Sequence, residues 1–198
     1  MKGIDVSYAQ GRVDWEDARR AGIDFAMVKV SQGKLLANPA VGPFVDPRVR
    51  ENLAGAARAG IPVGVYHYLC AGTVEEALAE ADFFLAAVRP YRDRIRLWAA
   101  CDAEEERYLP RERRALTGVV HAFLKKVRAG GMKPMLYTNP NYLTYRLNDM
   151  SLYDLWLAYW GASEARALAY NPKIWQYGAD AVGAMRRVDV NRGYFELP

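Results

Sequence analysis

The apolar positions of this chain repeat with two periods, one close to 3.6 residues and one of two. Over 74–88 the apolar residues fall on one face of a helix, and the same spacing occurs in 47–59 and 111–129. Thr73 and Glu76 stand at the spacing of a capping box, which marks a helix start. The pattern therefore predicts helices over 47–59, 74–88 and 111–129.

Short apolar segments between these helices are strand candidates, and the first five of them alternate with helices, which is typical of parallel strands joined by crossovers. After residue 150 the candidates lie close together and leave little room for helices. We therefore predict an α/β fold, a shortened and irregular TIM-like barrel of eight strands and about five helices. An open doubly wound sheet is the alternative, although no Gly-rich phosphate loop follows the first strand. The eight candidates are 3–7, 25–30, 62–68, 95–103, 133–138, 155–160, 174–178 and 188–191.

Composition favours one domain covering residues 1–198. The apolar share is 52%, enough for a sizeable core, and the chain shows no repeat, low-complexity tract or linker. No stretch is long and apolar enough to span a membrane, so no membrane insertion is expected. The first residues enter a strand-like segment at once, and no signal peptide is visible in the chain.

The net charge and the two cysteines give only weak information about the function. A formal net charge of +4 arises from scattered Lys and Arg, which fit either solvated helix faces or attraction to an anionic polymer such as a bacterial cell wall. No nucleic-acid-binding motif is present, so we expect no nucleic-acid partner. Cys70 and Cys101 are too few for a zinc site and fit buried thiols or one bridge. His67 and His121 are expected to be structural.

The triplet Asp102-Ala103-Glu104 ends an apolar run and is the first candidate for chemistry. Carboxylates on alternate residues of a strand point to the same side, roughly 6.6 Å apart at about 3.3 Å per residue. Two acids at the end of an apolar strand are costly unless function or charge pairing compensates. Paired carboxylates are the equipment of glycoside hydrolysis, but Asp-x-Glu also occurs on solvated loops.

Further acids and aromatic rings fall at other strand ends, where a parallel barrel gathers its chemistry. Asp5 lies on the first strand and Asp189 on the eighth. Each also has a simpler interpretation, because Asp5 suits a turn cap and Asp189 a pair with a nearby arginine. Carboxylates with aromatic rings suit a sugar better than a phosphate, which needs cations, although such rings also plug cores. The candidate sugar-stacking rings are Tyr66, Tyr137, Trp175, Tyr159 and Tyr177.

In the order of its motifs, the chain resembles the lysozymes of glycoside hydrolase family 25, the muramidases found among phage endolysins and bacterial autolysins. The resemblance covers nearly the whole chain and is more specific than any single motif. It is carried by Lys2-Gly3-Ile4-Asp5-Val6-Ser7, by Gly60 to Tyr68, by Asp102-Ala103-Glu104, by Tyr137-Thr138-Asn139, by Leu155-Trp156-Leu157-Ala158, by Ile174-Trp175-Gln176-Tyr177 and by Val188-Asp189-Val190-Asn191.

The resemblance implies an enzyme that hydrolyses the β-1,4 bond between N-acetylmuramic acid and N-acetylglucosamine in peptidoglycan. Glu104 would be the general acid, with Asp102 either the nucleophile or the group that orients the substrate's own acetamide. Asp5 and Asp189 would flank the cleft. We expect no metal or other cofactor, a monomer, glycan strands as the partner, and action on the cell wall by a secreted or endolysin-type route.

Two departures from the family keep other functions open. Gln32 stands where many members carry Glu, and the segment 34–46 is unusually rich in Pro and Gly. Because that segment is expected to border the cleft, a glycosidase on another N-acetylated polysaccharide is one alternative. A non-catalytic wall-binding module is the other.

Overall fold

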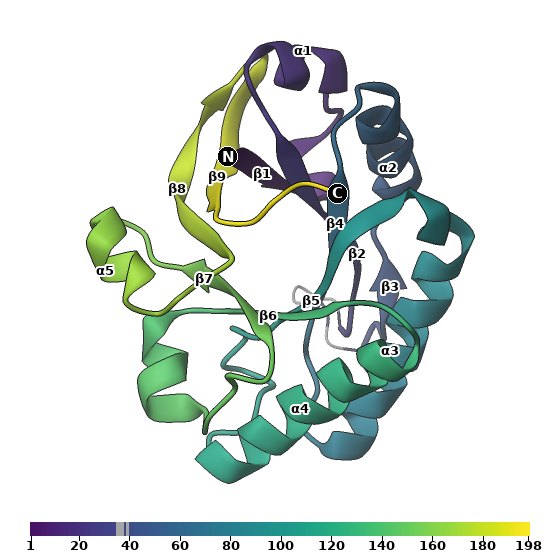
Figure 1. Ribbon diagram of the computed structural model, residues 1–198. Coiled ribbons are helices and arrows are strands. Elements are labelled where there is room, and N and C mark those ends of the chain that lie inside the picture. Colours follow the sequence, from purple (N-terminus) through teal and green to yellow (C-terminus); the bar gives the residue numbers. More distant parts are fainter. Residues whose placement is uncertain (35–37, 39) are drawn as a thin grey trace.

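The computed structural model describes residues 1–34, 38 and 40–198, and its strands form a ring (Figure 1). Eight strands close this barrel in the order β1-β9-β8-β7-β6-β5-β4-β2, with β2 also paired to β1, and β3 adds to β2 from outside. The predicted shortened barrel is therefore confirmed. The strands are β1 (Lys2–Val6), β2 (Phe25–Gln32), β3 (Phe44–Val45), β4 (Val63–Tyr68), β5 (Ile95–Asp102), β6 (Pro134–Thr138), β7 (Asp154–Ala158), β8 (Ile174–Val182) and β9 (Met185–Gly193).

Within the barrel, only β9 runs opposite to its neighbours. Neighbouring strands from β1 through β2, β4, β5, β6, β7 to β8 are parallel, whereas β9 runs antiparallel to both β8 and β1. The short β3 is antiparallel to β2 and was not predicted. Because β9 closes the ring in reverse, Asp189 at its middle pairs with Asp5 near the end of β1.

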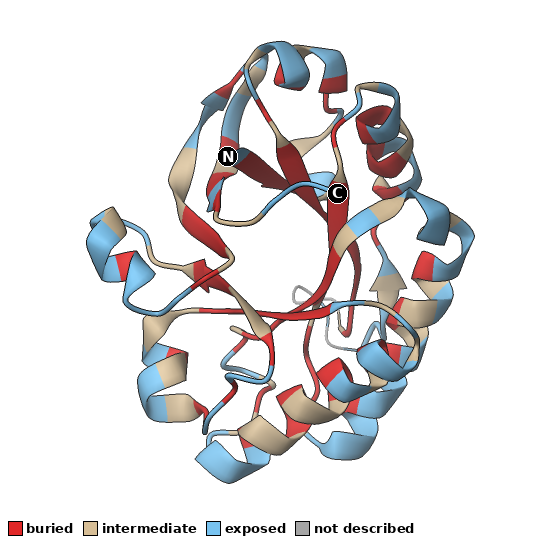
Figure 2. Cartoon of the chain, viewed as in Figure 1, coloured by how far each residue is buried: buried red, intermediate tan, exposed pale blue. Residues whose placement is uncertain are grey.

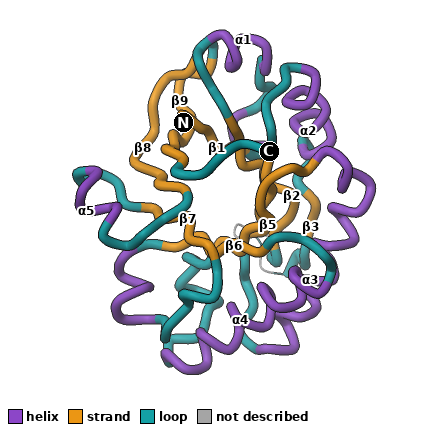
Figure 3. Tube along the Cα trace, in the orientation of Figure 1, coloured by secondary structure: helices purple, strands orange, loops and turns teal. Residues whose placement is uncertain are grey.

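The helices lie outside the ring of strands, with α2, α3 and α4 along one side (Figures 1 and 3). The three predicted helices are confirmed, but α2 begins at Val49 rather than at residue 47. The Asp46 carboxylate accepts hydrogen bonds from the backbone N–H groups of Tyr8 (2.8 Å) and Arg48 (2.8 Å), which holds an extra turn before the helix. The α-helices are α1 (Trp15–Arg20), α2 (Val49–Arg58), α3 (Val74–Val88), α4 (Arg113–Ala129) and α5 (Glu164–Leu168).

The barrel strands are mostly buried, whereas the helices alternate between buried and exposed positions (Figure 2). Alternation along the strands divides the buried side chains into two layers. One layer packs between strands and helices, and the other fills the barrel interior. Each large side chain removed from water contributes about 1.5–3 kcal/mol. The interior is filled with side chains below the carboxyl ends of the parallel strands, so it forms a floor and not a channel. Its members are Phe25, Met27, Tyr66, Trp98, Ala100, Met135, Tyr137, Trp156 and Ile174.

The structure also shows the state of the two cysteines and the length of the helices. Cys70 and Cys101 are buried free thiols, so the bridge that the sequence left open does not form. Among the described residues, no helix is long and apolar enough to cross a membrane.

Candidate active site

Asp102 and Glu104 project from the carboxyl end of β5 into the mouth of the barrel. The strand conformation continues past Asp102, because the Ala103 N–H donates to the carbonyl of Tyr137 on β6 (3.0 Å). Ala103 itself is buried in the outer layer, so its two acidic neighbours face the interior side. The Tyr142 hydroxyl donates to the Glu104 carbonyl (3.2 Å) and holds the backbone there.

Asp5 is held by a network of buried amides. Its Oδ2 accepts hydrogen bonds from Asn191 Nδ2 (2.8 Å) and Gln176 Nε2 (3.0 Å). The amide oxygens are occupied in turn, since Trp156 Nε1 donates to Asn191 (2.8 Å) and the Tyr137 hydroxyl donates to Gln176 (3.1 Å). This arrangement fixes both amides with their N–H groups toward Asp5.

Burial raises the pKa of all four predicted acids, and repulsion between carboxylates adds to this for Asp5, Asp102 and Glu104. Burial, followed by repulsion from Asp189, raises the pKa of Asp5 to about 7. Burial and then the charge of Glu104 raise the pKa of Asp102 well above its usual range, and burial and then Asp189 raise that of Glu104. Burial also raises the pKa of Asp189, against the charge of Arg187. The structure thus brings together all four acids, and protons are retained in the cluster at pH values where isolated carboxyls lose them.

A buried lysine accompanies these acids and was missed in the sequence. Lys29 lies on β2, where its ammonium donates to Gln32 Oε1 (2.7 Å) and sits 4.9 Å from the ring centroid of Tyr68. Burial lowers the pKa of Lys29, and Asp102 is the charge that opposes this most, ahead of Glu104. Within the described part of the chain, Asp102 Oδ1 has no hydrogen-bond partner. The signal available in the sequence was a single cation that follows four apolar residues of β2.

Replacing Asp5 by asparagine is expected to stabilise the protein in a pH-dependent manner. The folded pKa near 7 lies above the unfolded value near 4, so ionisation destabilises the folded state increasingly between pH 4 and 7. Asparagine still offers an acceptor to both amides. The free energy of unfolding should therefore rise by on the order of 4 kcal/mol at pH 8 and hardly at all at pH 4. Urea unfolding at both pH values, with the exposed Asp93→Asn as control, tests this, and an equal gain at both would contradict it.

Tyr66 and Tyr137 form part of the floor beneath the acids. Their rings meet Trp156 edge to face, with centroids 5.7 Å and 4.5 Å away. Both side chains are more than nine-tenths buried. Neither ring therefore presents a broad exposed face on which a bound molecule could stack.

The other three predicted rings lie in or beside the outer layer. Trp175 Nε1 donates to the Tyr159 carbonyl (3.0 Å), and the Trp175 ring packs against Tyr177 at 5.4 Å between centroids. Gln176 points into the barrel, so its neighbours on β8 point out. The structure therefore does not bring Trp175 to the acids. Tyr159 packs edge to face on Tyr170 at 6.2 Å.

Trp160 is a ring that sequence reasoning passed over. Its Nε1 donates to Gln176 Oε1 (2.9 Å), the oxygen that also accepts the Tyr137 hydroxyl. About half of its surface is exposed (48%), so the ring is joined to the acid network at one edge and open to solvent elsewhere. Trp160 directly follows the predicted candidate Tyr159. Because side chains alternate along the chain here, the Tyr159 side chain points in the opposite direction.

The two histidines lie away from the acids. His67 is fully buried between Ser31 Oγ, 2.8 Å from Nδ1, and Glu80, 2.9 Å from Nε2. Its ring stacks on Phe123 in the layer between strands and helices. His121 Nδ1 is 3.1 Å from the Tyr153 hydroxyl.

The unusual segment that follows β2 is only partly described. Gln32, its first departure from the family pattern, is the partner of Lys29, and its amide N–H bonds to the Lys34 carbonyl. Residues 35–37 and 39 lie outside the described residues, so the predicted effect of the loop on the cleft stays a prediction.

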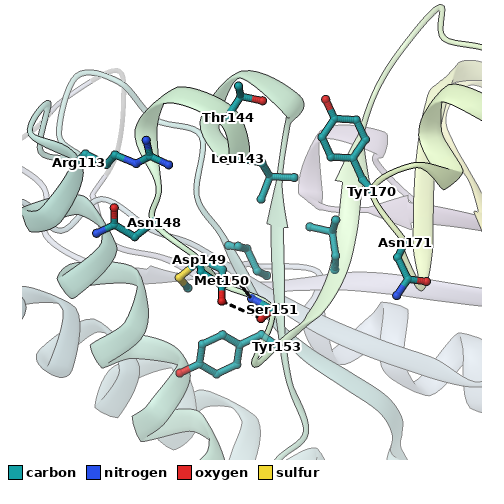
Figure 4. Close-up of a pocket in the computed structure, with 12 residues that line it drawn as sticks. Arg113, Leu143, Thr144, Asn148, Asp149, Met150, Ser151, Tyr153, Tyr170 and Asn171 are labelled. Atoms are coloured by element: carbon teal, nitrogen blue, oxygen red, sulfur yellow. Dashed lines mark hydrogen bonds between the residues drawn. The ribbon is translucent and has the colours of Figure 1, made fainter.

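A cavity of about 470 Å³ lies elsewhere, outside the barrel beside β6 and β7 (Figure 4). Its apolar floor includes Leu143 and Met150, and the Asp149 carboxylate within it accepts hydrogen bonds from Ser151. None of the predicted site residues lines it. Across residues 1–34, 38 and 40–198, no group of three or more His, Cys, Asp and Glu side chains is arranged to hold a metal ion.

Comparisons with known proteins give the family of the chain. The model of glycosyl hydrolases family 25 matches residues 4–183. The autolytic lysozyme of Clostridium acetobutylicum is 27% identical over 83% of this chain and 46% of its own length. Lysozyme M1 of Streptomyces globisporus is 28% identical over 98% of this chain and 67% of its own.

The fold comparison points the same way. The crystal structure of the bacterial lysozyme from Streptomyces coelicolor superposes with a TM-score of 0.75 at 24% identity, covering 99% of this chain and 93% of that one. The chain spans less than half of the Clostridium protein and about two thirds of the Streptomyces globisporus one. Since the family match extends from the first strand into the β8–β9 hairpin and the acids meet where such a barrel keeps its chemistry, the chain belongs to glycosyl hydrolases family 25.

Proposed function

We propose that the protein is a muramidase, which hydrolyses the β-1,4 bond between N-acetylmuramic acid and N-acetylglucosamine in peptidoglycan. The observation that carries this proposal is the meeting of Asp102 and Glu104 with Asp5 and Asp189 at the catalytic end of a family 25 barrel. Its curated relatives, named as lysozymes, support the same substrate. We propose a single catalytic domain, acting as a monomer on cell-wall glycan strands.

In this proposal Glu104 donates a proton to the leaving oxygen. Glu104 is only partly buried, so it is reachable at the mouth, and its raised pKa keeps it protonated to higher pH. Asp102 lies deeper. Burial and Glu104 raise its pKa, and the positive charge of Lys29, which acts more strongly with Asp102 than with Glu104, opposes this rise and favours the ionised form. The Asp102 carboxylate then either attacks the anomeric carbon or orients the substrate acetamide for that attack. Water completes hydrolysis, with Glu104 taking back a proton.

Mass spectrometry of the soluble products from purified peptidoglycan tests the proposal. Fragments that end in a reducing muramic acid would support it. Fragments that end in N-acetylglucosamine would keep a glycosidase but reject the bond. Release of nothing from several wall types would favour another polymer or a binding module without catalysis.

Replacing Lys29 by methionine is expected to move the acid limb of the pH–rate profile to higher pH. The ammonium lowers the pKa of Asp102, so its loss leaves more of that carboxyl protonated near neutrality. We expect kcat at pH 6 to fall about tenfold and to recover partly toward pH 8, one pKa unit being about 1.4 kcal/mol. Lys29→Arg should keep the original profile. A uniform loss at every pH would indicate a packing defect instead.

A second candidate, a glycosidase on another N-acetylated polysaccharide, is favoured by Gln32. This neutral side chain stands beside Lys29 where many family members carry a carboxylate, so the charge at the cleft floor differs. Parallel product analysis on chitin oligomers and peptidoglycan separates the two substrates, and preferential cleavage of chitin would select the second candidate.

A further inference from the structure

The hairpin of β8 and β9 extends past the acids and carries a separate groove of about 580 Å³. The exposed ring of Trp160 lines one part of it, and Arg186 and Arg187 line another. Trp160 is bonded to Gln176, which in turn bonds to Asp5. The groove therefore adjoins the candidate active site instead of lying on a remote surface.

One of these arginines, Arg187, lies close to the acids along β9. Asp189 and Asn191 are alternate residues of β9 and share a face, whereas the pairing with β8 is irregular between Met185 and Val188, where Arg187 lies. Asn191 points inward to Asp5, and Arg187 follows beyond Asp189 toward the tip of the hairpin. Its charge lowers the pKa of Asp189, consistent with this proximity.

Neither arginine forms a salt bridge with a described residue of the protein. Arg186 and Arg187 are exposed, and among the described residues neither has a carboxylate oxygen within 4.0 Å. The acid that shares the groove, Asp180, accepts the Ala181 N–H (2.7 Å). Two guanidinium groups without a protein partner, next to a cleft of carboxylates, suit an anion that arrives with the substrate.

The tip of the β8–β9 hairpin is bonded to α1, which holds the strand that carries the arginines in place. The Ala184 N–H donates to Asp17 Oδ2 on α1 (2.6 Å). Gly183 has φ of 54°, and a Cβ there would lie 2.0 Å from the same oxygen, so the close approach requires glycine. Val182 and Val188 are buried behind the groove.

We propose that this groove binds the ionised carboxylates of the stem substituents on a peptidoglycan strand, while Trp160 stacks on a neighbouring sugar of the same strand. The inference rests on the proposed function and extends it to the substituent that distinguishes muramic acid from N-acetylglucosamine. Guanidinium groups pair with carboxylates in a two-pronged geometry, and the attraction between exposed charges weakens as salt rises.

The test replaces both arginines by glutamine (Arg186→Gln with Arg187→Gln) and compares two forms of one solubilised peptidoglycan. One form is untreated, and in the other the carboxylates have been converted to amides. On the untreated form we expect KM to rise about tenfold with kcat within about twofold, as for two exposed charge pairs. On the amidated form the double variant and the parent should have the same KM.

Arg94→Gln with Arg96→Gln is the matched control, since it removes the same charge from exposed residues at the start of β5, the opposite end of the barrel. It should leave KM unchanged on both substrates. An unchanged KM in the Arg186/Arg187 variant, or an equal rise on both substrates, would overturn the inference.

A binding measurement separates this inference from the proposed function. In the Glu104→Gln background, the two arginine replacements should weaken binding of soluble glycopeptide fragments about tenfold at low salt, and less as salt rises. Equal affinity with and without the arginines would overturn the groove even if the parent protein is a muramidase. Absence of cleavage by the parent would instead reject the muramidase proposal.

Discussion

Glu104→Gln is expected to lower kcat on peptidoglycan by about 10²–10⁴-fold, with KM changed little, because a general acid contributes about that much. Glutamine keeps the size and the hydrogen-bonding oxygen of the side chain but has no proton to give to a leaving group. The backbone carbonyl of Glu104 accepts a hydrogen bond from the Tyr142 hydroxyl, and the substitution leaves this contact in place, so the local fold should survive the change. Release of reducing ends, followed by mass spectrometry, measures the effect.

Glu106→Gln is the control for this substitution. Glu106 is two residues further along, its side chain is exposed, and its carboxylate lies 3.8 Å from Arg146. It should retain nearly the full rate. If Glu104→Gln kept more than a tenth of the parent rate while Glu106→Gln lost activity, the acid would have been assigned to the wrong carboxyl.

Asp102→Asn should move activity and stability in opposite directions. We expect kcat to fall about 10²–10³-fold, as when a preorganised electrostatic group is removed from an active site. The same change deletes a buried charge whose Oδ1 has no partner among the described residues and whose pKa is raised by burial and by Glu104. The free energy of unfolding at pH 7 should therefore rise by about 1–2 kcal/mol, as is common when a functional site is relieved of strain.

Asp154→Asn is expected to change the free energy of unfolding in the opposite direction to Asp102→Asn. Although burial acts to raise it, the pKa of Asp154 is lowered overall, because Trp98 Nε1 donates to the carboxylate (2.7 Å) and Lys133 lies 3.0 Å away. Ionised Asp154 thus stabilises the fold, and its replacement should lower the free energy of unfolding without a large effect on kcat. Urea unfolding of both variants at pH 7 checks the contrast, and a loss of stability in Asp102→Asn would contradict it.

The periodic parts of the fold were predictable, because local rules act on them. The helices over 74–88 and 111–129 and all eight barrel strands follow from spacing alone, with boundaries that shift by a few residues. The extension of β8 and β9 into a long hairpin did not follow, since residues 179–187 are mostly exposed and carry no apolar pattern. Tertiary contact with Asp17 on α1 holds that hairpin tip instead.

The site was predictable where strand alternation was applied and missed where it was not. Asp102 and Glu104 face one side as their spacing requires, whereas Trp175 was grouped with the cleft although its neighbour Gln176 occupies the inward position. Lys29 was missed because it lies between apolar residues of β2, so the segment was interpreted only as a buried strand. The amides that hold Asp5 come from distant strands, and no local pattern in the sequence joins them.

Closure of the barrel by its last strand has a consequence for folding order. Asp5 is near the start of the chain, yet its hydrogen-bond donors lie 171 and 186 residues away. Contacts of such sequence separation form slowly, and during synthesis they must wait until nearly all of the chain has emerged. Until β9 arrives, β1 and β8 present open sheet edges to other chains. The acidic centre is therefore among the last features to assemble, and chains that stop before β9 should aggregate without ever acquiring it.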